Sequence, residues 1–195
     1  MYDFVENIKV DDLDNESFNV FREKIKGKNC FGEDILNLSN KELLYKINLI
    51  ENDKLKPAAI LLFHKTPEKF FPGAYIKVKS SFDGSFEKQQ DEVHNSLFMQ
   101  ADEIVNFLFG NYLYRKNNQN SFSRSLVENS IYYELAHKNF DLTLPFEIEV
   151  SDGVILIGAE CAIYDSGEVT QLLVNKKYDS LNQDIERIFQ MAGFK

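Results

Sequence analysis

The sequence has little of what would place it in several common protein classes. Its 195 residues include only two cysteines, Cys30 and Cys161, and their separation fits no metal-binding spacing, so we expect buried, reduced thiols rather than a disulfide. No apolar run approaches the roughly 18 residues that a membrane-spanning helix requires. The N-terminus also lacks a signal-peptide pattern. We therefore expect a cytoplasmic protein that does not associate with membranes.

Basic residues are also scarce. Lys and Arg number 22 against 31 Asp and Glu, which gives a formal net charge of -9, and no dense basic run occurs. Proteins that grip DNA or RNA do so largely by neutralising phosphates with Lys and Arg. We therefore expect no direct nucleic-acid binding by this segment. The P-loop pattern G-x-x-x-x-G-K-[ST] is absent from the sequence as well.

Apolar and aromatic residues, by contrast, are plentiful. They make up 44% of the chain and include 17 Phe and 9 Tyr, which is enough to build a sizeable core. The length suits one domain with a helical lead-in. We assign residues 1–50 to an extended and helical lead-in and residues 51–195 to one α/β unit.

The spacing of apolar residues predicts the order of helices and strands. Helices are predicted from Asp14, from the capping box of Ser39 and Glu42, and in the main unit over residues 86–114, 121–136, 168–174 and 181–191. The short apolar run 57–63 predicts a strand buried on both faces. Strands are also predicted over 74–79, 145–150 and 154–157, the last two joined by a tight turn at 151–153. The mixture predicts an α/β (α+β) fold, a two-layer sandwich of helices over a mostly antiparallel sheet.

The stretch around residues 121–140 is the centre of this scheme. Val127, Ile131 and Leu135 recur every four residues, as on a helix with one buried face. A polar cluster at His137–Phe140 follows, and then a strand. If the chain binds a nucleotide, we expect the binding residues here.

Several phrases of the sequence resemble one bacterial family. They are LSNKELLYKI at residues 38–47, AAILLF at 58–63, FFPGAYIK at 70–77, AHKNF at 136–140 and DIERIFQMAG at 184–193. The family contains proteins labelled transcriptional regulators or ATP-dependent helicase RecG-related proteins. The resemblance covers nearly the whole chain, and the phrase at 70–77 is its most specific part.

The resemblance implies a GHKL-type (Bergerat) ATP-binding fold. In the family this domain usually follows a Schlafen/AlbA-type domain and precedes a winged helix. Expected partners are therefore flanking regulatory domains or another protein, a second copy of the chain included.

The resemblance also implies a Glu-x-x-x-Asn pattern on the central helix, in which the Asn holds Mg²⁺ and the Glu polarises water. With His137 as the anchor, Tyr133 stands at the Asn position and Asn129 at the Glu position. An alternative alignment on residues 126–130 keeps Asn129 as the metal ligand and puts Ser125 at the Glu position. Neither alignment supplies a carboxylate. We therefore predict no catalytic residue and no metal site.

What remains is a vestigial nucleotide pocket of Asn129, Tyr133, His137 and Asp152. His137 has a competing interpretation, in which it caps the end of the central helix. The sequence thus favours a degenerate GHKL-type domain, a structural or interaction module that needs no cofactor. The alternative is a working ATP- and Mg²⁺-dependent domain whose base is Glu128 or Glu134.

Overall fold

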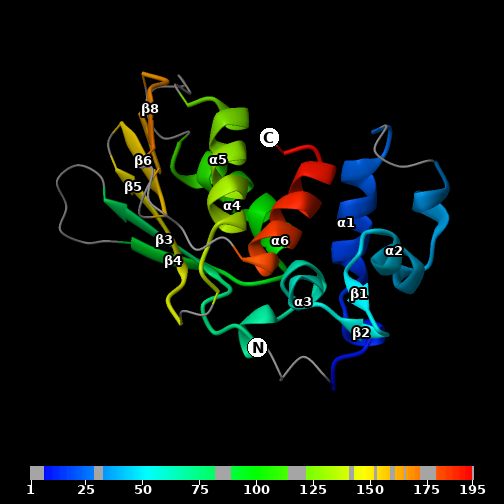
Figure 1. The fold of residues 1–195 in the computed structure, drawn as a ribbon. Helices are drawn as coiled ribbons and strands as arrows, with labels where there is room; N and C mark the ends of the chain where they lie inside the picture. The colour runs from blue at the N-terminus through cyan, green and yellow to red at the C-terminus, as the bar shows by residue number, and fades with distance from the viewer. Residues whose placement is uncertain are drawn as a thin grey trace.

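A six-stranded sheet and several layers of helices make up the described part of the chain (Figure 1). The computed structural model describes residues 7–28, 33–81, 89–113, 122–140, 143–151, 153–158, 161–164, 166–171 and 179–194. The helices are α1 (Asn15–Ile25), α2 (Asn40–Lys46), α3 (Pro57–Phe63), α4 (Leu97–Asn111), α5 (Arg124–Ala136) and α6 (Ser180–Met191). The strands are β1 (Ile50–Glu51), β2 (Lys54–Leu55), β3 (Ile76–Ser81), β4 (Gln89–Val93), β5 (Phe146–Ser151), β6 (Val154–Ile157), β7 (Cys161–Tyr164) and β8 (Val169–Gln171).

The main sheet is mostly antiparallel. Its strand order is β4-β3-β5-β6-β7-β8, and among the described strands β3 and β5 form the parallel pair. A parallel pair needs a long crossover, and here α4 and α5 lie between β3 and β5 in the chain. The predicted α+β fold, with helices over a mostly antiparallel sheet, is therefore confirmed.

One face of the sheet packs on helices, and the other faces away from them (Figure 1). Burial alternates along β3, where Ile76 and Val78 are buried and Lys77 and Lys79 are partly exposed. The same alternation recurs on β5, β6 and β7. Because successive side chains of a strand point to opposite faces, all buried positions share the helix side.

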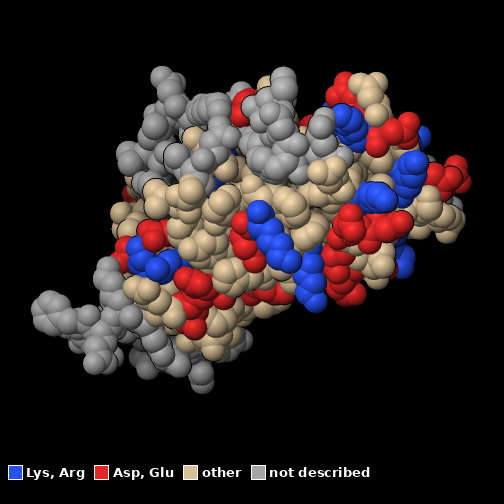
Figure 2. Space-filling model, turned by 90° about the horizontal axis from the view of Figure 1, so that it is seen from below, with Lys and Arg blue, Asp and Glu red and all other residues tan. Residues whose placement is uncertain are grey.

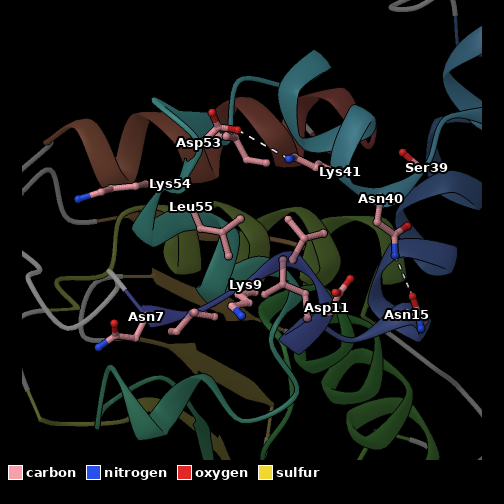
Figure 3. Close-up of a pocket in the computed structure, with 14 residues that line it drawn as sticks. Asn7, Lys9, Asp11, Asn15, Ser39, Asn40, Lys41, Asp53, Lys54 and Leu55 are labelled. Atoms are coloured by element: carbon pink, nitrogen blue, oxygen red, sulfur yellow. Dashed lines mark hydrogen bonds and ion pairs between the residues drawn. The ribbon is translucent and has the colours of Figure 1, made fainter.

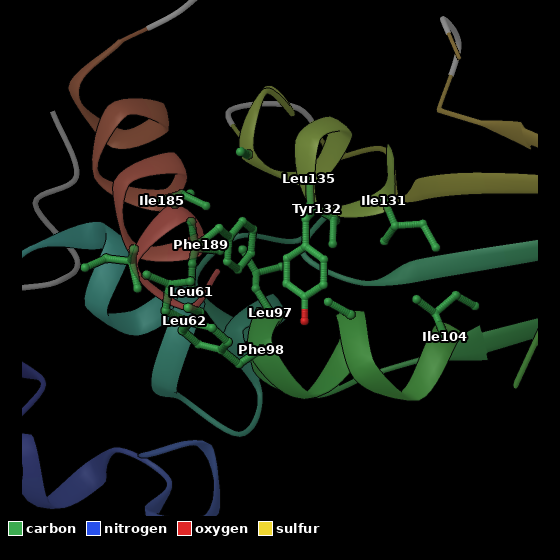
Figure 4. Packing of buried hydrophobic residues seen from close by; sticks show 14 of the residues in the cluster. Leu61, Leu62, Leu97, Phe98, Ile104, Ile131, Tyr132, Leu135, Ile185 and Phe189 are labelled. Carbon is green, nitrogen blue, oxygen red and sulfur yellow. The ribbon is translucent and has the colours of Figure 1, made fainter. Parts of the chain in front are cut away.

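Aromatic side chains join the helices into one core. Phe63 of α3 stacks on Phe18 of α1 at 4.3 Å between ring centroids. Phe189 of α6 lies edge-on to Phe98 of α4 at 5.4 Å and to Tyr132 of α5 at 4.8 Å, as Figure 4 shows from close by. The helix of the lead-in thus shares its core with helices from the rest of the chain.

Two helix starts are tied together by buried hydroxyl groups. Asp14 caps α1 by accepting from the backbone N–H and the Oγ of Ser17. The Ser17 Oγ lies 2.6 Å from the Oγ of Ser96, which caps α4 by accepting from Met99 N–H. The predicted capping box of Ser39 and Glu42 at α2 is also present.

The apolar run 57–63 forms helix α3, so the predicted strand is wrong. Pro57 occupies the first helical position, where its missing N–H costs nothing. All of residues 58–63 are buried, because α3 lies among other helices of the core. A helix that is apolar all round shows no 3.6-residue period, which is why it resembled a doubly covered strand.

Two other predicted helices also need correction. The range 86–114 contains strand β4 followed by α4, which begins only after the cap Ser96. Within 168–174, the described residues contain strand β8 rather than a helix. The hairpin of β5 and β6 is as predicted, and Gly153 in its turn has a φ of 77°. Of the two cysteines, Cys161 is buried and reduced, and Cys30 lies outside the described residues.

Candidate functional site

The predicted pocket residues on α5 do share one face of the helix. Asn129, Tyr133 and His137 follow each other at four-residue spacing, and Tyr133 is 41% exposed. The Tyr133 ring packs on the His137 ring at 4.2 Å with an angle of 30°. Asp152, the fourth predicted member, lies outside the described residues.

His137 occupies the end of α5. It is the C-cap residue, and its Nδ1 lies 2.7 Å from the carbonyl oxygen of Tyr133. This is the arrangement of the capping interpretation, in which an imidazole satisfies one of the last carbonyls of a helix.

Asn182 of α6 fixes the same helix end from behind. Its buried side chain donates from Nδ2 to the carbonyl oxygens of Ala136 at 2.7 Å and Lys138 at 3.0 Å. The sequence analysis did not identify Asn182 as a structural residue. Its position beside the apolar stripe of residues 181, 185 and 188 was the available sign that its amide is buried.

Lys138 follows at the start of the next loop. Its Nζ donates to the carbonyl oxygen of Leu144 at 2.7 Å and lies 5.6 Å from the centre of the Phe140 ring. Burial lowers the pKa of Lys138 to about 8. The loop after α5 therefore depends on a half-buried ammonium group and on Asn182.

Glu134 points from α5 toward the sheet. It is 3% exposed, and a Cβ placed on Gly158 would lie 3.3 Å from its Oε2 and 3.5 Å from the ring of Phe146. Gly158 also has a φ of 62°, a backbone conformation that side chains other than Gly rarely adopt. Glu134 therefore lies between helix and sheet and not beside Tyr133.

Glu128 lies on the side of α5 that carries Tyr132. The Tyr132 hydroxyl donates to Asp102 Oδ1 at 3.1 Å. Burial first, then Asp102 and finally the charge of Glu128 raise the pKa of Tyr132. Since Glu128 and Tyr132 are one helical turn apart, this glutamate is also turned away from the face of Asn129 and Tyr133.

These residues do not fit a Mg²⁺–nucleotide site of the kind that the resemblance implies. The face of Asn129, Tyr133 and His137 offers an amide, a phenol and an imidazole, whereas such a site pairs a carboxylate with a metal-binding amide. The two nearest glutamates on α5 point elsewhere. No step of ATP hydrolysis can therefore be assigned to this face.

The second candidate region is a hollow near the start of the chain, lined by residues between 7 and 55 and so ahead of β3, which begins at Ile76 (Figure 3). It has a volume of about 850 Å³ and lies between the N-terminal segment, the start of α2 and the β1–β2 hairpin. It is lined by Asn7, Ile8, Lys9, Val10, Asp11, Leu13, Asn15, Ser39, Asn40, Lys41, Ile50, Asp53, Lys54 and Leu55. Three separate segments line the hollow, so no single sequence motif could predict it.

Charges of both signs line both walls of this hollow. The hairpin side carries Asp53, which lies 3.7 Å from Lys41 Nζ and accepts a hydrogen bond from the Tyr45 hydroxyl. This hydrogen bond and the charge of Lys41 lower the pKa of Asp53. The opposite wall carries Lys9 and Asp11 (Figure 3). Acidic and basic residues are likewise interspersed over the face shown in Figure 2.

The hairpin's turn explains this position of Asp53. Asn52 and Asp53 have φ values of 50° and 58°, as a two-residue type I′ turn requires, and Asn and Asp tolerate them best after Gly. At the other end of the hollow, Asn40 Nδ2 donates to Asn15 Oδ1 at 2.8 Å.

Comparison with known proteins finds similarity to a family model over part of the chain and to a solved structure. A family model described as "Domain of unknown function (DUF8451)" matches residues 2–76, which include the whole lining of the hollow near the start of the chain. No curated protein matches the chain. No helix among the described residues is both long and apolar enough to cross a membrane.

Among solved structures, the DIP2311 protein from Corynebacterium diphtheriae has a similar fold. The TM-score is 0.63 at 14% sequence identity, and the match covers 96% of this chain and 32% of that chain. This chain thus spans about a third of the length of the DIP2311 protein. It is similar to that protein in fold, and over residues 2–76 it is similar to a family that has no assigned function.

Proposed function

We propose that this chain is a degenerate GHKL-type domain that serves as a structural or interaction module and does not hydrolyse ATP. The observation that supports the proposal most directly is the chemistry of the exposed face of α5. An aromatic side chain, Tyr133, stands where the family resemblance expects the Mg²⁺ ligand, and it packs on His137.

The competing hypothesis, an active ATPase with Glu128 or Glu134 as base, requires a carboxylate that can reach a nucleotide on this face. Glu134 is 3% exposed and lies against Gly158 and Phe146. Glu128 is on the side of Tyr132. A general base must lie within hydrogen-bond reach of the water that it activates, so the positions of both side chains favour the module over the enzyme.

The proposal extends to the setting of the domain. We propose that it works within a regulatory protein, together with other domains or a partner chain. The resemblance to transcriptional regulators supports this setting, and so does the match to one third of a longer chain.

A thermal melt tests the proposal. A ligand that binds the folded state raises the melting midpoint, by an equivalent of about 2.7 kcal/mol at a hundredfold excess over the dissociation constant. With millimolar Mg²⁺-ATP or Mg²⁺-ADP we expect no shift, and we expect no phosphate release from ATP above a buffer control.

Variants of α5 make this test specific. The double variant Asn129→Glu with Tyr133→Asn restores the Glu-x-x-x-Asn pattern and shows whether the surrounding fold can still accept nucleotide. Phosphate release by the unaltered chain that disappears in Asn129→Ala or Glu134→Gln would refute the proposal.

A further inference from the structure

Exposed apolar side chains gather on the last strands of the sheet. Among the described residues, the large apolar side chains that stay exposed are Tyr45, Tyr133, Leu144, Leu156, Tyr164 and Val169. Three of these six, Leu156, Tyr164 and Val169, belong to the adjacent strands β6, β7 and β8.

The strand register puts two of the three on the face that the helices leave open. Leu156 pairs with Ala162, and Val154 pairs with Tyr164. Their chain neighbours Ile155 and Ile163 are fully buried on the helix side, so these four side chains point the other way. We call Val154, Leu156, Ala162 and Tyr164 the outer strip.

Val169 belongs to the opposite face. It pairs with Ile163, which is buried, and residues directly paired across two strands point to the same side of a sheet. Val169 is 41% exposed, against 38% for both Leu156 and Tyr164. It is therefore a matched control for the outer strip.

A charged area that is close to neutral adjoins the outer strip. On β3 and β5 the same face carries Lys77, Lys79, Glu147 and Glu149, which pair in register across the two strands. Lys79 Nζ lies 2.7 Å from Glu147 Oε1. On β4 the same face also carries Glu92, which pairs with Lys77. Two lysines against three glutamates leave this area close to neutral, although the whole chain carries a net charge of -9.

The edges of the sheet are poor places for another strand. The edge strand β4 carries Asp91 and Glu92, which would meet like charges if two copies paired along this edge. The other edge strand, β8, includes three of the described residues. Association of two sheets is therefore better served by the open face than by the edges.

We infer that the outer strip is the centre of an interface with a second copy of this chain, packed sheet against sheet. Two copies that each carry -9 repel one another over most of their surface, so they can meet best where the charges nearly balance. An apolar centre with a polar, charged margin is also the usual composition of a protein interface.

The geometry is consistent with two-fold symmetry. A two-fold axis that lies between the sheets and runs across the strands places outer strip on outer strip and charged area on charged area. Aligned sheets pack about 10 Å apart, a distance that Leu156 and Tyr164 side chains can fill from both sides. The inference rests on the proposed interaction role and adds the partner and the surface to it.

Sedimentation velocity of the full chain at about 1 to 100 μM tests the inference, with an intact fold checked by circular dichroism. We expect the unaltered chain to dimerise, and Leu156→Lys to weaken dimerisation on the order of a hundredfold because two unpaired charges enter the interface. Val169→Lys, on the other face of the sheet, should dimerise as the unaltered chain does.

Three outcomes would overturn the inference: a monomer at all concentrations, a dimer that persists in Leu156→Lys, or equal loss of the dimer in Val169→Lys. If Leu156→Lys does not fold, Leu156→Ser and Tyr164→Ser replace it, with Val169→Ser as the control. A monomer that also fails to hydrolyse ATP would overturn the dimer while leaving the proposed loss of ATP turnover in place. A dimer that releases phosphate from ATP would support the proposed interface and contradict the proposed loss of ATP turnover.

Discussion

The two sides of α5 differ in how firmly the rest of the molecule holds them. On the inner side, Tyr132 contacts Phe189 and donates to Asp102, and Glu134 lies against Gly158. On the outer side, Asn129, Tyr133 and His137 are half-buried or exposed, and Tyr133 and His137 contact each other.

This difference indicates what the helix does in the fold. The inner side anchors α5 between the sheet and α6, so substitutions there act on stability. The outer side carries the positions that the family resemblance associates with nucleotide, and we expect substitutions there to leave the fold intact, because these side chains are half-buried or exposed. Substitutions on the two sides of this one helix can therefore separate effects on stability from effects on the vestigial pocket positions.

The largest effect is expected at Phe189 of α6, which packs against Tyr132 on the inner side of α5. Phe189→Ala removes a ring that contacts both Phe98 and Tyr132 and leaves a cavity, which we expect to lower the free energy of unfolding by about 3–5 kcal/mol. Urea unfolding followed by circular dichroism measures it. Leu144→Ala is the control, because Leu144 is 66% exposed, and equal losses in the two variants would contradict the assigned core.

A smaller loss is expected at Asn182. Asn182→Ala leaves the carbonyl oxygens of Ala136 and Lys138 without their donor, which we expect to cost about 1–3 kcal/mol. The same urea titration measures it, with Gln190→Ala on the exposed part of α6 as the control. Hydrogen exchange should show faster opening at the C-terminal end of α5 than in the control. An unchanged exchange rate there would mean that Asn182 does not fix this helix end.

Patterns within one element were the predictable part of the fold. The capping box at Ser39, the apolar stripe of α5 and the β5–β6 hairpin depend on residues only a few positions apart in the chain, and all three agree with the structure. The fold class was predicted as well, because it follows from the alternation of such elements.

Features that depend on distant parts of the chain were not predictable in the same way. The run 57–63 is a helix because other helices surround it, a fact that its own composition hides. The hydrogen bond from Asn182 to Ala136 joins segments far apart in sequence, and the hollow near the start of the chain is built from three separate segments. For the candidate site, the sequence placed Asn129, Tyr133 and His137 together, whereas the directions of Glu128 and Glu134 needed the surrounding contacts.

Lys138, which follows the outer side of α5, predicts a dependence on pH. Its pKa of about 8 in the folded chain is below the usual value of about 10.4 for an unfolded lysine. Between these values the unfolded chain binds more protons, so the stability contributed by this group rises as the pH increases from about 8 to about 10. Urea unfolding at several pH values measures the rise, and we expect Lys138→Met to flatten it. An identical pH profile in Lys138→Met would contradict the assignment.

The smallest effect is expected at Tyr133, next to the strongly anchored Tyr132. Tyr133→Ala removes a ring that is 41% exposed and packs on His137, so we expect a change in unfolding free energy within about 0.5 kcal/mol. Tyr132→Phe removes only the hydroxyl that donates to Asp102, yet it should cost more, about 1 kcal/mol. Urea titrations of the two variants side by side test the contrast directly. If Tyr133→Ala were the more damaging change, the outer side of α5 would be structural, and the difference between the two sides of this helix would not hold.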